Sequence, residues 1–314
     1  MCTAIRFNDR LFGRTFDYER SFGEMMYVLP RSRAKICSCE NRYAIMGVGV
    51  LGSGRPMFFD GVNEYGLCAA ALNFPHYAVY HKGNGILRSI PSGDLIGYAL
   101  GQCKSVKETK ALFSDIVIAD TSDAEGSSPL HWIFADRNEA VTVESMAEGL
   151  LVMTNPIGVM TNSPDLKYHL TRLGDFAAVD RSNPDVGMCD SLIYSRGMGG
   201  IGLPGDFSSS SRFIRAAFLR ESVDLSVSEG SYADVSLAMA VMSNLSIPKG
   251  AVLADDGSDV YTRYAAVIDL DEPGYYLSTA ACRAIGHIRL SDSMCDGAGP
   301  EGMPIYHKEY IFDL

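Results

Sequence analysis

Cys2 is the residue of this 314-residue chain whose position alone suggests chemistry. An aminopeptidase removes an initiator Met when the next residue is small, and loss of Met1 would leave Cys2 with a free α-amine. A thiol has an ordinary pKa of about 8.5 and an α-amine one of about 7.7–8.0, so such an amine can take the thiol proton at little energetic cost. A nucleophile and its base then share one residue, as in N-terminal Thr enzymes. Position alone also fits an unremarkable Cys on a frayed terminus.

Arg14 and Asp17 lie in the polar-apolar run 13–19 (GRTFDYE). If this run is a strand paired with the one that begins at Cys2, both side chains approach the terminus. The Asp17 carboxylate would then accept a hydrogen bond from the α-amine, and the Arg14 guanidinium would favour the thiolate by its charge. As a bare pattern, an Arg and an Asp on one strand also fit a pair on the surface.

An acyl-transfer site also needs hydrogen-bond donors aimed at the developing oxyanion. Asn73 ends an apolar run before Phe74, and Asn162 lies in the turn-like segment 158–164 (GVMTNSP). Arg212 opens a helical pattern and adds a second candidate cation. Each also fits a simpler role, because Asn is common in turns and Arg is common on helix surfaces.

Strands and helices must position these residues, and two kinds of sequence pattern predict them. Alternating or continuous apolar runs bounded by Gly, Pro, Asn and Asp predict strands at 3–7, 11–18, 25–29, 43–50, 57–62, 67–73, 115–119, 130–135, 140–145, 149–153, 259–269, 273–279, 286–290 and 304–312. Helical spacing predicts helices at 94–103, 105–113, 163–173, 209–222 and 231–245, the second opened by a capping box at 105–108. Residues 63–66 between two strands read as a hairpin turn. Strands and helices do not alternate one for one, so we expect two antiparallel sheets between helical layers, in one domain.

Composition excludes several classes of function. The net charge is −11 and Lys and Arg form no cluster, which argues against a nucleic-acid partner. No stretch reaches the ~18 apolar residues of a membrane span, and the N-terminus lacks the pattern of a secretory signal, so we expect a cytoplasmic protein without a membrane partner. The eight cysteines show no finger-like spacing, and we expect no metal site.

Familiar catalytic motifs are absent as well. The six histidines form no HExxH, and no GxSxG offers a serine nucleophile. The glycines at 47–54 do not precede a predicted helix, so a nucleotide site is not expected. Because the proposed base is an amine, His131 and His169 are expected to be structural.

Taken together, the motifs are similar to those of the choloylglycine hydrolases, the N-terminal-nucleophile family that contains bile salt hydrolases and penicillin V acylases. The resemblance runs in order along almost the whole chain. It is carried by MCT at 1–3, LFGRTFDYE at 11–19, DGVNEYGLCAAALNFP at 60–75, PLHWIFAD at 129–136, NPIGVMTNSP at 155–164, GLPGDFSSSSRFIRAAF at 202–218, IPKG at 247–250 and YTRYAAVIDLDEPGYYLST at 261–279.

The resemblance implies an α+β fold, the four-layer αββα sandwich, as a single domain over 2–314 after loss of Met1. It implies a homotetramer, and it implies no metal and no organic cofactor. Position by position it assigns Cys2 as the nucleophile with its α-amine as the base, Arg14 as a neighbour of the thiolate and Asp17 as the partner of the amine. It assigns Asn73 and Asn162 to the oxyanion region, and it assigns Arg212 to steadying the charged site.

The substrate expectation rests on a smaller part of the resemblance. Residues 72–75 read LNFP, as in bile salt hydrolases, where penicillin acylases tend to have Tyr. This favours conjugated bile salts, whose steroid needs an apolar groove, and Phe16, Phe58 and Phe59 are candidate walls that also fit the core. Arg20 replaces a residue that is often uncharged in relatives and either meets the glycine or taurine end or faces solvent.

Three alternatives remain open at this point. Penicillin V or an N-acyl homoserine lactone would be cleaved by the same mechanism. A non-catalytic relative would bind bile acids without turning them over. The sequence does not decide between glycine and taurine conjugates.

Overall fold

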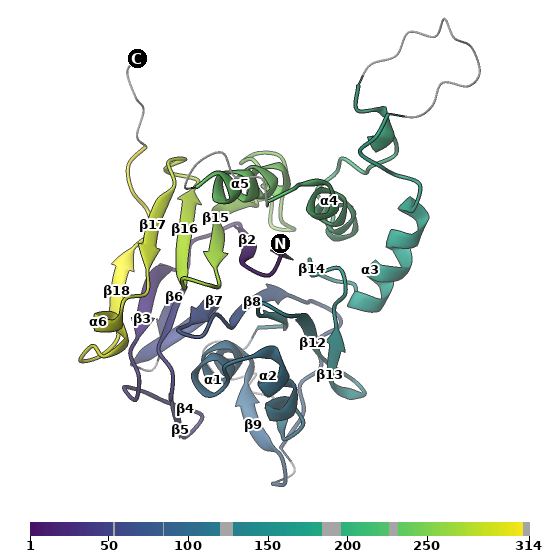
Figure 1. Ribbon diagram of the computed structural model, residues 1–314. Helices are drawn as coiled ribbons and strands as arrows, with labels where there is room; N and C mark the ends of the chain where they lie inside the picture. Colours follow the sequence, from purple (N-terminus) through teal and green to yellow (C-terminus); the bar gives the residue numbers. More distant parts are fainter. Residues whose placement is uncertain (53, 84, 120–127, 184–195, 226–231, 310–314) are drawn as a thin grey trace, which may run out of the picture.

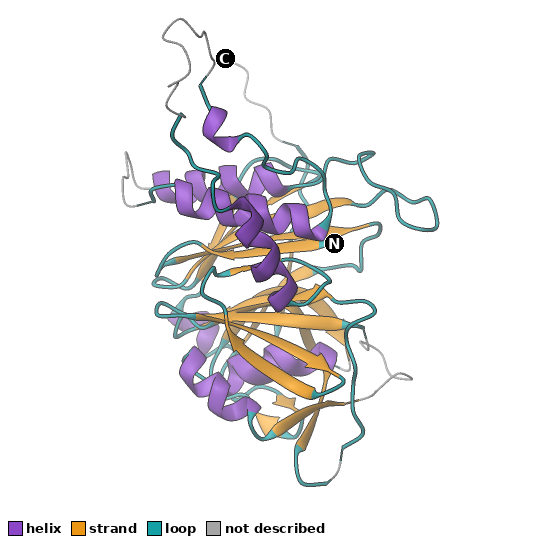
Figure 2. Cartoon of the chain, turned by 90° about the vertical axis from the view of Figure 1, so that its right-hand side faces the viewer, coloured by secondary structure: helices purple, strands orange, loops and turns teal. Residues whose placement is uncertain are grey.

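The strand that begins at Cys2 belongs to one of two sheets that pack face to face between helices (Figure 1, Figure 2). The computed structural model describes residues 1–52, 54–83, 85–119, 128–183, 196–225 and 232–309. In Figure 2 the layers run from helices at the top, through both sheets, to helices at the bottom. The predicted αββα sandwich is therefore confirmed.

The first sheet has six antiparallel strands, and those carrying Cys2 and Arg14 are adjacent in it. Its order is β14 (Val159–Met160), β1 (Cys2–Arg6), β2 (Leu11–Tyr18), β15 (Tyr261–Asp269), β16 (Gly274–Thr279) and β17 (Gly286–Arg289). The register places Cys2 opposite Phe16 and Ala4 opposite Arg14. Because opposite residues share a face, and i and i+2 share a face, Cys2, Phe16 and Arg14 all point to the same side of the sheet.

The second sheet has eight antiparallel strands and faces the first. Its order is β13 (Gly149–Thr154), β12 (Ala140–Met146), β11 (Leu130–Ala135), β8 (Cys68–Asn73), β7 (Arg55–Asn63), β6 (Ile45–Gly52), β3 (Met25–Leu29) and β18 (Glu301–Pro304). The predicted turn between β7 and β8 is present. Asn63 accepts hydrogen bonds from the amides of Tyr65 and Leu67, and Gly66 has φ +78°.

Helices cover the outer face of each sheet. Helix α1 (Leu95–Gln102) packs on β6, β7 and β8, and α2 (Val106–Phe113) lies beside it. On the other side, α4 (Ser209–Ser222) packs on β1 and β14, and α5 (Ala233–Leu245) packs on β2 and β15. The shorter helices are α3 (Leu166–Leu173), α6 (Asp292–Cys295) and the 3-10 turns η1 (Ser92–Asp94), η2 (Gly174–Phe176) and η3 (Met198–Gly200).

Three apolar clusters hold the four layers together, and strand alternation divides residues among them. Along β1 and β2, Ala4 and Phe12 point between the sheets, whereas Ile5 and Leu11 point toward the helices. Gly13 allows α5 to approach β2 closely, because a Cβ there would lie 2.6 Å from the sulfur of Met242. The inter-sheet cluster contains Cys2 itself, so the expected nucleophile belongs to the core.

Three details of the strand prediction were wrong. The strand predicted at 304–312 is β18 (Glu301–Pro304), because Pro304 lacks an amide donor and ends the pairing at Met25; residues 310–312 lie outside the described residues. Strand β9 (Arg88–Pro91), which pairs in parallel with β10 (Ile116–Ala119), was not predicted because only one of its side chains is buried. The two-residue strands β4 (Lys35–Ile36) and β5 (Cys39–Glu40) were also missed.

Candidate active site

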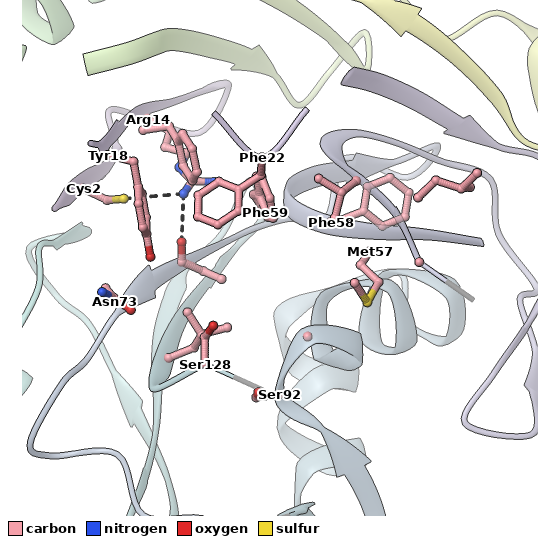
Figure 3. Close-up of a pocket in the computed structure, with 17 residues that line it drawn as sticks. Cys2, Arg14, Tyr18, Phe22, Met57, Phe58, Phe59, Asn73, Ser92 and Ser128 are labelled. Carbon is pink, nitrogen blue, oxygen red and sulfur yellow. Dashed lines mark hydrogen bonds between the residues drawn. The ribbon is translucent and has the colours of Figure 1, made fainter. Parts of the chain in front are cut away.

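Cys2 borders a cavity of about 380 Å³ that opens between the two sheets (Figure 3). Its side chain comes from the first residue of β1, and the residue is only 1% exposed. The cavity wall is mainly apolar and is formed by Cys2, Arg14, Phe16, Tyr18, Phe22, Val50, Leu51, Gly52, Met57, Phe58, Phe59, Ala71, Asn73, Ser92, Gly93, Ser128 and Leu130. The thiol therefore meets whatever fills this cavity.

Met1 extends the strand that carries Cys2. Its amino group donates to the carbonyl of Asp17 at 2.6 Å, and the Asp17 amide donates back to the carbonyl of Met1 at 2.9 Å. With Met1 attached, the nitrogen of Cys2 is a peptide amide and has no basic lone pair. Excision of Met1 would create the amine on a residue that the sheet already holds in place.

Arg14 lies beside the thiol, as expected. Its Nη2 is 3.7 Å from the sulfur of Cys2 and donates to the carbonyl of Ala71 at 2.9 Å (Figure 3). Its Nη1 pairs with the carboxylate of Asp60, and both side chains are almost completely buried. Burial opposes the charge on Arg14, but Tyr264, Asp60 and Cys2 outweigh it and raise the pKa above its ordinary value. The guanidinium is therefore a fixed positive charge facing the sulfur.

Asp60 is a site residue that the sequence analysis missed. Besides Arg14, its carboxylate accepts hydrogen bonds from the phenols of Tyr264 and Tyr275, the latter at 2.8 Å. Burial raises the pKa of both phenols, so both remain protonated donors. The available signal was a charged residue inside an otherwise apolar strand, which is costly unless the charge is paired.

Asp17 is fully buried next to the terminus, but its carboxylate has other partners here. It accepts hydrogen bonds from the hydroxyls of Thr262 at 2.6 Å and Thr15 at 3.1 Å. The amide of Cys2 instead donates to Asn162. The expected contact between Asp17 and the α-amine stays a prediction for the chain without Met1.

Asn162 joins three of the predicted residues. Its Oδ1 accepts from the Cys2 amide at 2.7 Å and from Arg212 Nη2 at 2.9 Å, and its Nδ2 donates to the carbonyl of Asn73 at 2.8 Å. Two donors on one atom and a carbonyl on the other fix the orientation of the amide. In this arrangement Nδ2 is already used, whereas the side chain of Asn73 borders the cavity (Figure 3). The oxyanion roles of both residues stay predictions.

Arg212 reaches Cys2 from the first turn of α4 and is not on the helix surface. It is fully buried, and its Nη1 donates to the carbonyl of Cys2 and to the hydroxyl of Thr3 at 2.6 Å. Its Nε donates to the carbonyl of Phe207 at 3.0 Å. Burial lowers its pKa, and Asp17 and Cys2 partly compensate. Arg212 thus holds the main chain on which Cys2 is mounted.

Two buried histidines hold the turn that carries Asn162. His131 donates from Nε2 to the carbonyl of Thr161 at 2.8 Å, and His169 does the same to the carbonyl of Asn162 at 2.9 Å. His131 stacks on Phe74, the residue after Asn73, with ring centroids 4.1 Å apart. His169 stacks in the same way on the residue after Arg212, at 4.8 Å. Both imidazoles are therefore used to position the site.

We expect His169 to make the folded state less stable in mild acid. Burial lowers its pKa below the ordinary value of 6.5, so the unfolded chain binds more protons than the folded one. Stability therefore falls as the pH drops through about 6.5, with a slope of at most about 1.4 kcal/mol per pH unit. Urea unfolding of wild type and His169→Gln at pH 7.5 and 5.5 measures this loss. The loss of stability between pH 7.5 and 5.5 should be smaller in His169→Gln than in wild type, but unchanged in His307→Gln, whose side chain is exposed. Equal losses in all three proteins would contradict the role of His169 in this pH dependence.

The aromatic residues predicted as walls all border the cavity. Phe16 and Phe59 stack with centroids 5.0 Å apart, while Phe58 borders the cavity but packs mainly toward α1. Tyr18 and Phe22, which the sequence analysis did not single out, complete this wall. Tyr18 could have been found because it lies two residues after Phe16 on the same face of β2, and Phe22 because it is an aromatic residue in the loop that follows. Arg20 lies over the Phe22 ring, 5.1 Å from its centroid, at the exposed rim.

Metal-binding clusters and membrane-spanning helices were sought in the part of the chain that the structure describes. Within it, no group of three or more His, Cys, Asp or Glu residues has the geometry to hold a metal ion. Also within it, no helix combines the length and the apolar character needed to cross a membrane.

Comparison with known proteins gives one consistent result. The family model for linear amide C–N hydrolases, choloylglycine hydrolase family, matches residues 2–301. A bile salt hydrolase/transferase from Lactiplantibacillus plantarum is 37% identical over 308 residues, covering 94% of each chain. The crystal structure of a variant conjugated bile acid hydrolase from Clostridium perfringens superposes with a TM-score of 0.89 over 100% of both chains, at 28% identity. Penicillin V acylase from Agrobacterium tumefaciens, at 19% identity, a TM-score of 0.75 and coverage of 98% and 95%, shares the fold.

Proposed function

The chain belongs to the choloylglycine hydrolase family and is a linear amide C–N hydrolase, and from this premise we propose that it cleaves glycine- or taurine-conjugated bile acids. The observation that carries the proposal is the thiol of Cys2 on the wall of an aromatic-lined cavity. Cys2 is the proposed nucleophile, and its α-amine, freed by loss of Met1, is the proposed base. A volume of about 380 Å³ lies within the usual range of small-molecule sites.

The first half of the proposed reaction forms a thioester. The amine takes the thiol proton, and the thiolate, facing Arg14, attacks the carbonyl carbon of the amide. The negative oxygen is stabilised by the side chain of Asn73 with Asn162 and a backbone N–H, and each such donor contributes on the order of 3 kcal/mol. The protonated amine, oriented by Asp17, then gives its proton to the leaving nitrogen, and glycine or taurine departs.

The second half regenerates the enzyme. The neutral amine removes a proton from water, and the hydroxide formed attacks the thioester carbon. Collapse of this intermediate releases the bile acid and returns the thiolate beside the protonated amine. A concentrated amine can replace water in this step, so acyl transfer is an expected side reaction.

The assembly and location belong to the same proposal. We propose a single domain from Cys2 onward that acts as a homotetramer in the cytoplasm and uses no metal or organic cofactor. Support for the tetramer comes from the resemblance to the family, and support for the cofactor-free reaction comes from the amine, which supplies the base.

Amine release from three substrates tests the proposal. The protein lacking Met1 is incubated with glycocholate, taurocholate and penicillin V, and released amine is quantified over time. We expect turnover of at least one bile salt well above that of penicillin V, because the cavity is lined mainly by apolar and aromatic side chains. Faster turnover of penicillin V, or of an N-acyl homoserine lactone in a parallel assay, would replace the substrate. Tight cholate binding with no turnover and no effect of iodoacetamide would identify a non-catalytic binder.

A further inference from the structure

A short loop forms one side of the cavity mouth. Residues 19–24 connect β2 to β3, and Phe22 from this loop borders the cavity while remaining 38% exposed. Its ring lies edge-on against Tyr18, with centroids 4.9 Å apart, and against Phe59 at 5.8 Å (Figure 3). No strand pairing holds these residues. Something else must therefore keep an exposed aromatic ring over the mouth.

Glu24 provides that restraint from within the loop. One carboxylate oxygen accepts hydrogen bonds from the amide of Phe22 at 2.7 Å and from the hydroxyl of Ser21 at 2.8 Å. The side chain is fully buried, although it is a carboxylate. Burial would raise its pKa, but the hydrogen bonds from Tyr306, Ser21 and the loop amide lower it, so the group is ionised. Charge-assisted hydrogen bonds of this kind are stronger than neutral ones.

The other oxygen of Glu24 connects the loop to the end of the described chain. It accepts a hydrogen bond from the phenol of Tyr306, two residues after β18, and lies 4.0 Å from Nε of Arg263 in β15. Tyr306 and Arg263 do not border the cavity of Cys2. A single carboxylate thus links the cavity mouth to a segment 282 residues away.

We propose that Glu24 is a positioning residue for substrate, and that Tyr306 acts through it to hold Phe22 over the steroid. The proposal rests on the function proposed above and assigns no chemical step to Glu24. Without the carboxylate, the hydrogen bonds within the loop and the hydrogen bond from Tyr306 are weakened or lost, and the ring of Phe22 leaves the cavity wall. The steroid would then bury less apolar surface, while the geometry of Cys2, Arg14 and Asn162 stays the same.

We call the hydrogen bonds of Glu24 to the loop and to Tyr306 the clamp. Loss of the clamp is expected to raise KM and to leave kcat almost unchanged. In Glu24→Gln and Tyr306→Phe, KM for the better bile salt should rise about tenfold and about threefold, respectively, since each variant loses hydrogen bonds to a charged group. The kcat should stay within about twofold of wild type, because Glu24 does not touch the reacting atoms. The rate of alkylation of Cys2 by iodoacetamide, a reagent too small to need the wall, should also stay within about twofold.

Glu64→Gln is the matched control. Glu64 is also a largely buried carboxylate that restrains the chain, accepting from Arg31 and from the amide of Ala44, but it does not border the cavity. Its loss should lower the melting temperature without changing KM. An equal rise of KM in Glu64→Gln, or a wild-type KM in both clamp variants, would overturn the proposal. If Glu24→Gln does not fold, Tyr306→Phe decides, because it removes one hydroxyl and keeps the ring.

The same measurements separate this proposal from the proposed function. A wild-type protein that turns over no bile salt contradicts the function, whatever the variants do. In that case the substrate that is turned over replaces the bile salt in the KM comparison. A clamp that fails while wild type hydrolyses bile salts contradicts only the role of Glu24.

Discussion

The variant Cys2→Ala is expected to lose amide hydrolysis by a factor on the order of 10⁴ or more, since removal of a nucleophile leaves only binding and oxyanion stabilisation. The fold should persist, because the change removes one sulfur from a residue whose main chain is held by Asn162 and Arg212. Released glycine or taurine measures the activity, and circular dichroism measures the fold. Denaturing mass spectrometry after mixing with substrate should show an acyl adduct on wild type and none on this variant.

A protein that retains Met1 is the matched control, because its thiol is intact and only the amine is blocked. We expect it to be as inactive as Cys2→Ala, and removal of Met1 by an aminopeptidase should restore turnover in proportion to the excised fraction. The intact mass gives that fraction directly. Full activity in a preparation that keeps Met1 would contradict the proposed base, and full activity in Cys2→Ala would contradict the nucleophile.

The variant Asp60→Leu is expected to lower the free energy of unfolding by about 3–5 kcal/mol, the usual cost of breaking a buried ion pair. Arg14 would keep a buried charge with no counter-ion, and the phenols of Tyr264 and Tyr275 would lose their acceptor. This loss is a large part of the 5–15 kcal/mol that stabilises a typical protein. Urea unfolding monitored by tryptophan fluorescence measures it.

The double variant Arg14→Met with Asp60→Leu separates stability from catalysis. It replaces the pair by apolar side chains of similar volume, so it should recover much of the stability that either single variant loses. The double variant should nevertheless be inactive, because no guanidinium then lies beside the sulfur of Cys2. Recovery of activity together with stability would show that Arg14 acts only through the fold.

Much of the secondary structure was predictable because its signals are local. The helix predicted at 209–222 has those bounds as α4, and the strand predicted at 11–18 is β2. Both patterns depend on side-chain period and capping within a few residues. The strand predicted at 304–312 failed because Pro304 ends the pairing of β18 with β3, and the apolar pattern does not show where a pairing with a distant strand begins.

For the candidate site too, what local motifs show was predictable and what depends on distant partners was not. The six assigned residues were predicted from motifs, and the structure brings them together around the N-terminal end of β1. The sequence did not show that Arg212 binds the carbonyl of Cys2, since a helix pattern does not reveal what its first turn contacts. Nor did it single out Glu24 or Asp60, because their partners Tyr306, Tyr264 and Tyr275 lie 204 to 282 residues away.

The sequence by itself determined the proposed reactive unit, a thiol and an amine on one residue, because both groups are joined by covalent bonds. Only the tertiary structure decided what surrounds that unit. Two sheets meeting face to face place Arg14 against Asp60 and the sulfur of Cys2 against an aromatic wall. Burial is a property of the packed layers. It strengthens the electrostatic interactions of these charged groups and makes an unpaired charge costly.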